Sequence, residues 1–122
     1  MRAKSKVDMA INSSKDGIMT LEKFLPWKEV LLESTSAKAK LINFVIFPSN
    51  RGGYNIYTVP EKLGSFTSRK LFPKEWAGLK DEDLQKVTTV ETARFCHNKC
   101  FICAVDTKED ALKLAKIANG TY

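Results

Sequence analysis

What the sequence lacks excludes several classes of protein. Its uninterrupted apolar runs, such as 44–47, are far shorter than the roughly 20 residues that a membrane-spanning helix needs. The N-terminal segment 1–17 is positively charged but has no apolar stretch of the kind found in secretory signal peptides. The chain has three cysteines, an odd number, which argues against a disulfide framework. We therefore expect a cytoplasmic protein with reduced thiols and no membrane contact.

The sequence also has little that could support catalysis. It contains no glycine-rich phosphate loop, no Gly-x-Ser-x-Gly turn and no paired carboxylates, and it has a single histidine, His97. The imidazole is the one side chain type whose ordinary pKa suits proton transfer near neutral pH. A small hydrolase that uses His97 is therefore one hypothesis for the function, ranked third behind ligand binding and protein interaction. The sequence favours a domain without catalytic residues and without a cofactor.

Length and composition predict one globular domain. The chain has 122 residues, of which 43% are hydrophobic, with only 6 Gly and 4 Pro. A chain of this size hides roughly two-thirds of its unfolded surface when it folds, which is enough for one modest core. The segment 1–16 ends in a polar cluster and reads as a flexible N-terminal arm. The folded domain is expected over residues 17–122.

Turn residues and apolar periodicity locate the secondary structure. Two strand-forming runs flank the turn-rich segment 48–53, which predicts an antiparallel hairpin. A start signal at Thr107 and a stop at Gly120 predict a terminal helix. The other predicted elements are a strand over 18–24, a helix over 26–34, an exposed loop over 66–72, a short helix from Asp81 and a second hairpin over 94–105. The order predicts an α+β fold, a mainly antiparallel sheet of about five strands with helices packed on one face.

The positive charge of the chain is unevenly distributed. The formal net charge is +6, and residues 1–80 hold 14 Lys and Arg against 7 Asp and Glu, whereas residues 81–122 hold 6 against 7. Clustered cations raise the local potential and release counterions when they contact phosphates. An anionic ligand, nucleic acid or nucleotide, is therefore expected, although many small soluble proteins are basic for solubility alone.

The segment Ser68-Arg69-Lys70 is the best candidate for anion binding. A hydroxyl, a guanidinium and an ammonium group lie next to one another in a predicted loop. A guanidinium can hold phosphate through two hydrogen bonds, and an ammonium adds a point charge. The alternative is an ordinary solvated surface. We predict that Ser68, Arg69 and Lys70 contact the ligand.

A cysteine-rich segment offers an alternative metal site. Four potential zinc ligands, Cys96, His97, Cys100 and Cys103, lie within eight residues. In strands, however, adjacent side chains point to opposite faces, which separates such ligands. Redox Cys-x-x-Cys motifs normally begin a helix, whereas this one falls on a predicted strand. We expect no metal, and three small thiols buried in a sheet.

Four sequence blocks carry a family resemblance. They are LPWKEVLLE over 25–33, FPSNRGGYNIYTVP over 47–60, GSFTSRKLFPKEWAGLKDEDL over 64–84 and FCHNKCFICAVDTKEDAL over 95–112. In this order they resemble the C-terminal half of the MYG (melanocyte-proliferating-gene) family, which is similar to DHH-type phosphoesterases and metal-dependent hydrolases. The resemblance covers most of 17–118 and leaves out that family's catalytic N-terminal half. It implies ligand binding by the FTSRK segment, by Lys28 and by His97.

The resemblance is weaker in the last block. Where the family pattern has Ser-Gly and Gly-Gly, this chain has Lys99-Cys100 and Cys103-Ala104. Glycine allows a ligand to approach the backbone closely, so ligand binding by this hairpin is in question. An interaction module is therefore the alternative function. In that case, a surface that the catalytic half would cover binds a separate protein chain or a second copy of the domain.

Overall fold

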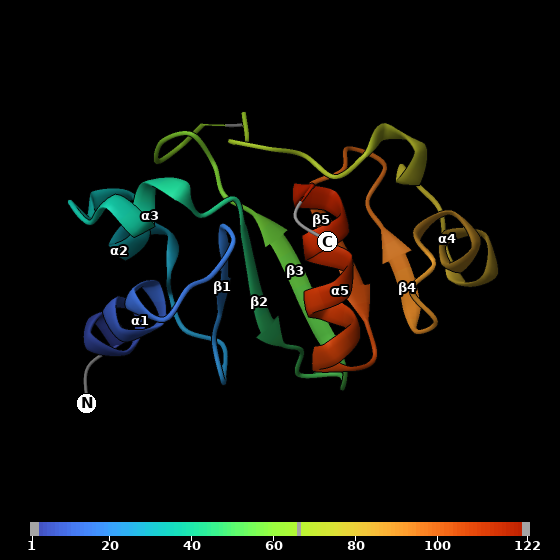
Figure 1. Ribbon diagram of the computed structural model, residues 1–122, viewed down its shortest axis with the longest axis horizontal. Coiled ribbons are helices and arrows are strands. Elements are labelled where there is room, and N and C mark those ends of the chain that lie inside the picture. The colour runs from blue at the N-terminus through green and yellow to red at the C-terminus, as the bar shows by residue number, and fades with distance from the viewer. Residues whose placement is uncertain (1–2, 66, 121–122) are drawn as a thin grey trace.

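The computed structural model describes residues 3–65 and 67–120. In this part of the chain, one sheet has the strand order β1-β2-β3-β5-β4; β1 runs parallel to β2, and the other neighbouring strands are antiparallel. The elements in chain order are α1 (Ala3–Asn12), β1 (Ile18–Thr20), α2 (Lys28–Glu33), α3 (Ala37–Leu41), β2 (Phe44–Pro48), β3 (Tyr54–Thr58), η1 (Lys74–Trp76), α4 (Asp81–Thr88), β4 (Ala93–Cys96), β5 (Ile102–Val105) and α5 (Lys108–Asn119) (Figure 1). The predicted α+β class and mainly antiparallel sheet of about five strands are confirmed.

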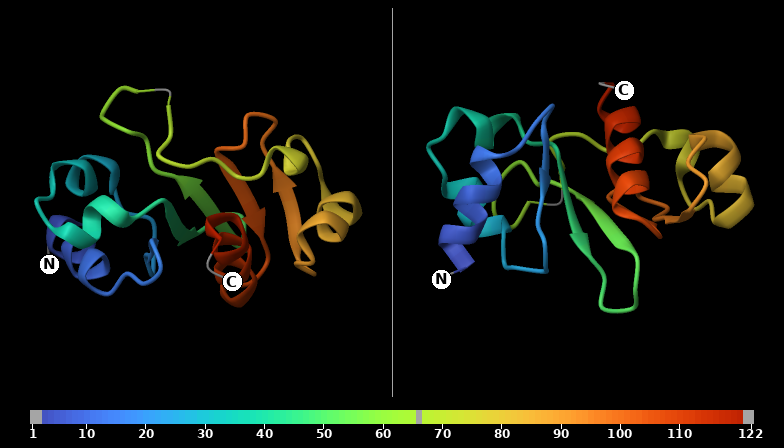
Figure 2. Two further views of the ribbon diagram at one scale, coloured as in Figure 1. Left: turned by 45° about the horizontal axis from the view of Figure 1, so that its top comes forward. Right: turned by 60° about the horizontal axis from the view of Figure 1, so that its bottom comes forward.

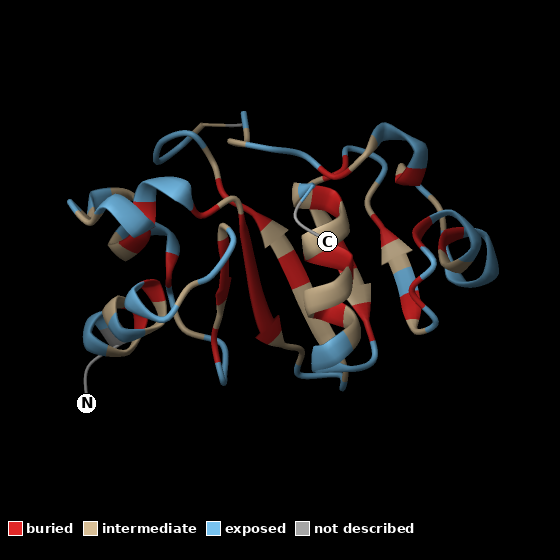
Figure 3. Cartoon of the chain, viewed as in Figure 1, coloured by how far each residue is buried: buried red, intermediate tan, exposed pale blue. Residues whose placement is uncertain are grey.

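Strand β2 is buried on both faces. Its residues Phe44 and Ile46 belong to one apolar cluster, and the alternate residues Val45 and Phe47 belong to another. Successive side chains of a strand point to opposite faces, so the two clusters lie on opposite sides of the sheet. Figure 3 shows β2 buried along most of its length. A continuous apolar run of this kind is typical of a strand that is covered on both sides.

Helices cover both faces, so the prediction that they pack on one face is wrong. The cluster around Phe44 includes residues of α4 and α5, whereas the cluster around Val45 includes residues of α1, α2 and α3. Figure 2 shows α1, α2 and α3 gathered at the β1 end of the sheet and α4 beside β4 at the other end. The prediction missed this arrangement because α1 and α3 were not recognised as helices.

The N-terminal segment forms a packed helix where the sequence predicted a flexible arm over 1–16. In α1, Val7 and Ile11 lie one turn apart on the same side of the helix, and their exposed fractions are 0% and 1%. Both belong to the cluster that also contains Trp27 and Leu31 of the α2 region. The polar residues that suggested a loose arm lie on the exposed side of α1 and in the turn that follows it.

Both predicted hairpins are present. Strands β2 and β3 pair in register from Phe44↔Thr58 to Pro48↔Tyr54, and β4 pairs with β5. Gly53 in the first turn has φ +75°, and a Cβ atom there would lie 2.5 Å from the carbonyl oxygen of Val105. Only glycine allows this close approach without strain, and it lets the turn reach the end of β5.

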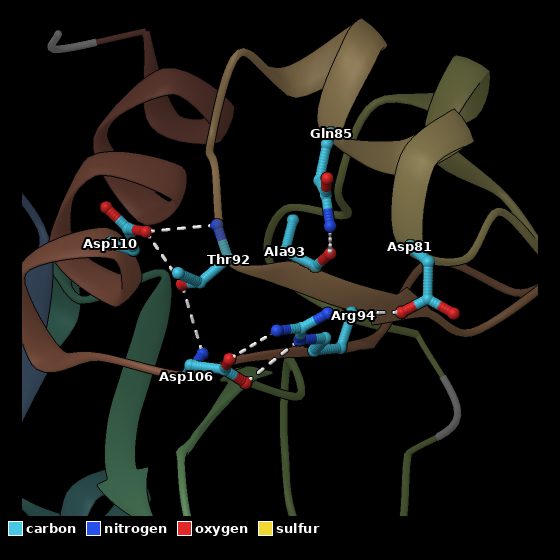
Figure 4. A network of polar contacts seen from close by, with 7 residues as sticks. All are labelled: Asp81, Gln85, Thr92, Ala93, Arg94, Asp106 and Asp110. Carbon is cyan, nitrogen blue, oxygen red and sulfur yellow. Dashed lines mark hydrogen bonds and ion pairs between the residues drawn. The ribbon is translucent and has the colours of Figure 1, made fainter.

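A polar network ties the β4–β5 hairpin to its helices (Figure 4). The N–H and hydroxyl of Thr92 donate to Asp110 Oδ2 at 3.1 and 2.6 Å, at the start of α5. Arg94 donates to both carboxylate oxygens of Asp106, at 3.0 and 2.6 Å, and this hydrogen bonding lowers the pKa of Asp106. The contribution of this pair is therefore present above the ordinary carboxyl pKa and is lost as pH falls through the lowered value.

The terminal helix follows its predicted signals. The N–H of Asp110 donates to the Thr107 hydroxyl at 3.1 Å, and Gly120 ends the helix with φ +75°. With 12 residues, α5 is too short to cross a membrane, and the other helices of residues 3–65 and 67–120 are no better candidates. The cytoplasmic location inferred from the sequence stays a prediction.

Shortening Ile11 to alanine tests whether α1 belongs to the folded core. Because Ile11 is 1% exposed, Ile11→Ala should lower the free energy of unfolding by about 2–5 kcal/mol in urea titrations. Met9→Ala is the matched control, since Met9 lies in the same helix and is 58% exposed. Equal, small effects of the two substitutions would mean that α1 is not part of the core.

Candidate functional site

Four segments that are distant in the sequence meet where α3 and α5 end. They are 12–17, 37–42, 67–72 and 115–120, and we call the region that they form the basic junction. Lys38 Nζ donates to the carbonyl of Asn12 at 2.8 Å, which links α3 to the turn after α1. Lys70 Nζ donates to the carbonyl of Asn119 at 3.2 Å, which links the loop before η1 to the end of α5.

Arg69 is the anchor of this junction. Its Nη1 donates to the carbonyls of Ala39 and Ile42, at 2.7 and 2.9 Å, and its backbone N–H donates to Val59 at 2.7 Å. Carbonyls at the end of a helix lack partners within the helix, so a cation there satisfies them. Burial lowers the pKa of Arg69, yet a guanidinium stays charged at any physiological pH. Arg69 therefore has a structural role that the sequence did not reveal.

The turn after α1 approaches the end of α5 closely. Asn119 Nδ2 donates to the carbonyl of Asp16 at 2.6 Å, and Asn43 Nδ2 donates to Asn119 Oδ1 at 2.8 Å. A Cβ atom on Gly17, whose φ is +77°, would lie 2.8 Å from Asn119 Nδ2 and 2.9 Å from the carbonyl of Leu41. Glycine at this position thus lets the four segments come together.

The basic junction concentrates the positive charge of the chain. One acidic residue, Asp16, occurs in the four segments. Their cations are Lys15, Lys38, Lys40, Arg69, Lys70 and Lys116. Six cations minus one carboxylate give a formal charge of +5, against +6 for the whole chain. Lys15, Lys40 and Lys70 are exposed to solvent. In the sequence, the sign of this region is the excess of positive charge before residue 80. The fold decides which of the charged residues lie together.

Of the five predicted ligand-binding residues, three lie in the basic junction. Ser68 and Lys70 flank Arg69 there, and the Ser68 hydroxyl is 2.8 Å from the Thr58 hydroxyl. Lys28 lies elsewhere, at the start of α2, with its Nζ 5.8 Å from the ring centre of Trp27. His97 lies in the turn between β4 and β5. The structure therefore brings together Ser68, Arg69 and Lys70 but not Lys28 or His97.

Lys28 lines a groove between α2 and the sheet, with a volume of about 1160 Å³. The groove has an aromatic floor, in which the ring centres of Phe24 and Phe47 are 5.3 Å apart and those of Phe47 and Tyr57 are 5.1 Å apart. Its charged residues are Lys4, Asp8, Lys28, Glu29 and Glu33. Two cations and three carboxylates give a formal charge of −1, so the groove is a poorer site for phosphate than the basic junction.

His97 lies beside a half of the sheet that none of the helices in residues 3–65 and 67–120 covers. The residues of β3, β5 and β4 on this face are only half-buried, and we call them the open half-face: Asn55, Phe95, Ile102 and Ala104. The His97 ring centre is 4.5 Å from that of Phe101 and 6.3 Å from that of Phe95. Its Nδ1 accepts the N–H of Lys99 at 3.0 Å. These contacts position the imidazole but pair it with no nucleophile, so they lend no support to a hydrolase that uses His97.

The cysteines and His97 do not form the alternative metal site. Cys96 and Cys103 face the core, whereas His97 lies on the other side of the sheet with its aromatic neighbours. Among the described residues, no three His, Cys, Asp or Glu side chains gather in a way that could hold a metal ion. Strand alternation separates the histidine from the thiols.

The chain was compared with known proteins. The family model MYG1_exonuc, described as "Uncharacterised protein family (UPF0160)", matches residues 1–118. The chain belongs to the MYG1 family. It is 40% identical over 101 residues to the MYG1 exonuclease of Homo sapiens, and the matched residues cover 80% of this chain and 27% of that protein. It is 36% identical over 115 residues to MYG1 protein YER156C of Saccharomyces cerevisiae, which covers 92% of this chain and 34% of that protein.

The MYG1 relatives are much longer than this chain. The Dictyostelium discoideum MYG1 protein is 36% identical over 104 residues, which cover 84% of this chain and 32% of that protein. The chain thus spans about a third of the length of the curated relatives that it matches. No solved structure matches it significantly.

Replacing Arg69 tests its structural role. Arg69→Ala removes the donor to the carbonyls of Ala39 and Ile42, two residues that are at most 1% exposed, and should lower the free energy of unfolding by about 1–3 kcal/mol. Lys70→Ala, a neighbouring and exposed cation, is the control and should change it by less than about 0.5 kcal/mol. Urea unfolding measures both. Equal losses would show that Arg69 does not hold the end of α3.

Proposed function

We propose that this MYG1 domain binds nucleic acid through the phosphate-contacting cations of the basic junction. The observation that carries the proposal is the formal charge of +5 gathered from four segments of the chain. A surface of this kind attracts a polyanion, because each cation that neutralises a phosphate releases a counterion. The name "exonuclease" that several mammalian relatives bear fits a polynucleotide ligand.

The geometry of the junction favours a polymer over a single small anion. Its cations extend from three different segments, with Lys15 in the turn after α1, Lys40 on α3 and Lys70 in the loop before η1. Arg69 is held in place by the carbonyls at the end of α3 and keeps its charge. A fixed guanidinium with exposed ammonium groups on neighbouring segments suits several phosphates along one strand.

The proposed role is binding and not catalysis. The polar side chains of the basic junction are ammonium groups, a guanidinium, amides, hydroxyls and the carboxylate of Asp16, and the Ser68 hydroxyl is hydrogen-bonded to that of Thr58. None of these is paired with a general base in the way that an activated nucleophile requires. The proposal therefore leaves the reaction that the relatives' name describes to other parts of MYG1 proteins.

Removing three exposed cations tests the proposal. Lys15→Gln, Lys40→Gln and Lys70→Gln together should weaken binding of a labelled single-stranded oligonucleotide, measured by fluorescence polarisation at a series of salt concentrations. If each lysine contacts one phosphate, the slope of log K against log salt should become shallower by about 2, at roughly 0.7 per contact. The variant leaves Arg69 in place, so the donors to the carbonyls of Ala39 and Ile42 are kept.

The matched control removes the same charge elsewhere. Lys74→Gln, Lys80→Gln and Lys86→Gln lower the net charge equally but lie in or beside η1 and α4, outside the four segments. This control should retain affinity and salt slope close to those of the unmodified protein. Equal losses of affinity in the two variants would mean that net charge alone causes the effect, which would contradict a site at the basic junction.

A second candidate function is contact with another part of a MYG1-type protein. The open half-face supports it, since the half-buried apolar side chains of Phe95, Ile102 and Ala104 lie on a sheet surface outside the cluster that α1, α2 and α3 cover. The exposed Phe24 and Leu63, at 58% and 51%, adjoin Tyr57 in the groove. The occupant that we propose is the remaining two-thirds of the longer relatives' chains, because it is the additional protein mass that accompanies this domain there.

Hydrogen exchange tests this second function. The matching domain of the human relative should exchange the amide hydrogens at the positions of β4 and β5 more slowly in the full-length protein than as an isolated domain. The positions that match α5, on the other face of the sheet, serve as the internal control and should exchange alike in both. Identical exchange at the β4 and β5 positions would contradict contact through the open half-face.

A further inference from the structure

The three cysteines of the chain meet in the core beside the β4–β5 turn. Cys96 ends β4, Cys100 lies in the turn and Cys103 lies in β5. All three are free thiols and all are buried, with exposed fractions of 0%, 5% and 0%. Neither the fold nor the proposed binding of nucleic acid requires thiols at these positions, since small apolar residues would fill the same space.

Cys96 and Cys103 are directly opposite each other in the antiparallel β4–β5 pair. The backbone of Cys96 bonds away from β5, because its N–H donates to Leu79 at 3.1 Å and its carbonyl accepts the N–H of Gly78 at 3.0 Å. The pair is therefore of the non-hydrogen-bonded type, in which the Cα atoms of opposite residues are closest, about 4.5 Å apart. This separation lies within the range of about 4.4–6.8 Å that a disulfide spans.

The thiols also interact with one another. Hydrogen bonding with Cys103, and to a smaller degree with Cys100, lowers the pKa of Cys96 although burial opposes it. Burial raises the pKa of Cys103 and of Cys100. Cys96 is thus the thiol most readily converted to the nucleophilic thiolate, and its hydrogen-bonded neighbour across the hairpin is positioned to react with it next.

We propose that Cys96 and Cys103 are a reversible oxidation site that closes to a disulfide across the β4–β5 hairpin. The inference rests on strand register, backbone hydrogen bonding and burial, and it is independent of whether the domain binds nucleic acid. The pair that closes is not the Cys-x-x-Cys pair of Cys100 and Cys103.

The chemistry balances with hydrogen peroxide as the two-electron oxidant. The Cys96 thiolate attacks one peroxide oxygen, the O–O bond breaks and the departing hydroxide takes up a proton to become water, which leaves a sulfenic acid on Cys96. The Cys103 sulfur then attacks the Cys96 sulfur, so the S–S bond forms, the S–O bond breaks and a second water leaves with the proton of Cys103. Two thiols and one peroxide give one disulfide and two waters.

Access to the buried pair runs through the turn. Residues 98 and 99 are exposed, and Cys100 in the same turn has φ +61°, a strained conformation for a residue other than glycine. The turn is held by the Cys100 carbonyl, which accepts the N–H of Phe72 at 3.0 Å, and by the Cys100 thiol, which is 3.6 Å from the carbonyl of Pro73. Local opening of this turn admits a molecule close in size to water.

The disulfide has a measurable consequence for stability. It closes a short loop around the turn, which restricts the unfolded chain, so the midpoint of thermal unfolding should rise by several degrees on oxidation. The same loop contains His97 and Phe101 and abuts Phe72, which follows the cations of the basic junction. Oxidation therefore fixes the turn that separates the open half-face from the loop over 67–72.

Mass spectrometry of the peroxide-treated native protein tests the proposal. The intact mass should fall by two hydrogens, digestion should give a Cys96–Cys103 linked peptide, and dithiothreitol should reverse both changes. Cys100→Ser is the matched control and should form the same link, whereas Cys96→Ala and Cys103→Ala should not. The thermal midpoint of the Cys100→Ser protein should rise on oxidation and return on reduction.

Other outcomes would overturn the proposal. A link that contains Cys100 in the unmodified protein, or irreversible addition of oxygen to the thiols, would assign the chemistry differently. The proposal would also be wrong if the native protein kept three free thiols under conditions that oxidise the same protein when it is unfolded in denaturant. Because the unmodified chain is mapped directly, these readings hold even if an alanine variant fails to fold.

Discussion

Burial of β2 on both faces is the constraint on which the structure depends. The run Phe44–Phe47 directs alternate side chains into two apolar clusters, and each cluster recruits different helices. One face packs against α4 and α5, from the end of the chain, and the other face packs against α1, α2 and α3, from its beginning. Because the side chains of β2 alternate between the two faces, this single strand packs against helices from both halves of the sequence. Each face must exclude water to stabilise the fold.

The basic junction is a consequence of that arrangement. Once helices from both ends of the chain pack against one sheet, the ends of α3 and α5 come near the same edge, and their terminal carbonyls need donors. Arg69 and Lys70 supply donors to both, and Asn119 joins the turn that contains Gly17. Cations that complete helix ends therefore accumulate in one place, so that the same residues serve the fold and create a surface suited to phosphate.

The groove, the open half-face and the basic junction differ in chemical character. The groove beside α2 has an aromatic floor and a small negative charge, and the open half-face has half-buried apolar side chains. Neither resembles the basic junction, where six cations accompany one carboxylate. Such a division allows a polyanion and a protein surface to be recognised at separate places on one small domain, since charge suits the first and apolar area suits the second.

Local signals in the sequence determined much of the fold. The turn residues over 48–53 placed the β2–β3 hairpin, and Thr107 with Gly120 placed α5, because caps and turns depend on neighbouring residues only. Helix α1 was missed, since its stability comes from burying Val7 and Ile11 against distant residues. Likewise the sequence pointed to Ser68, Arg69 and Lys70, but only the tertiary structure decided that Lys15 and Lys40 join them and that Lys28 and His97 do not. The proximity of charges depends on which helices meet, and that is set by long-range packing rather than by spacing along the chain.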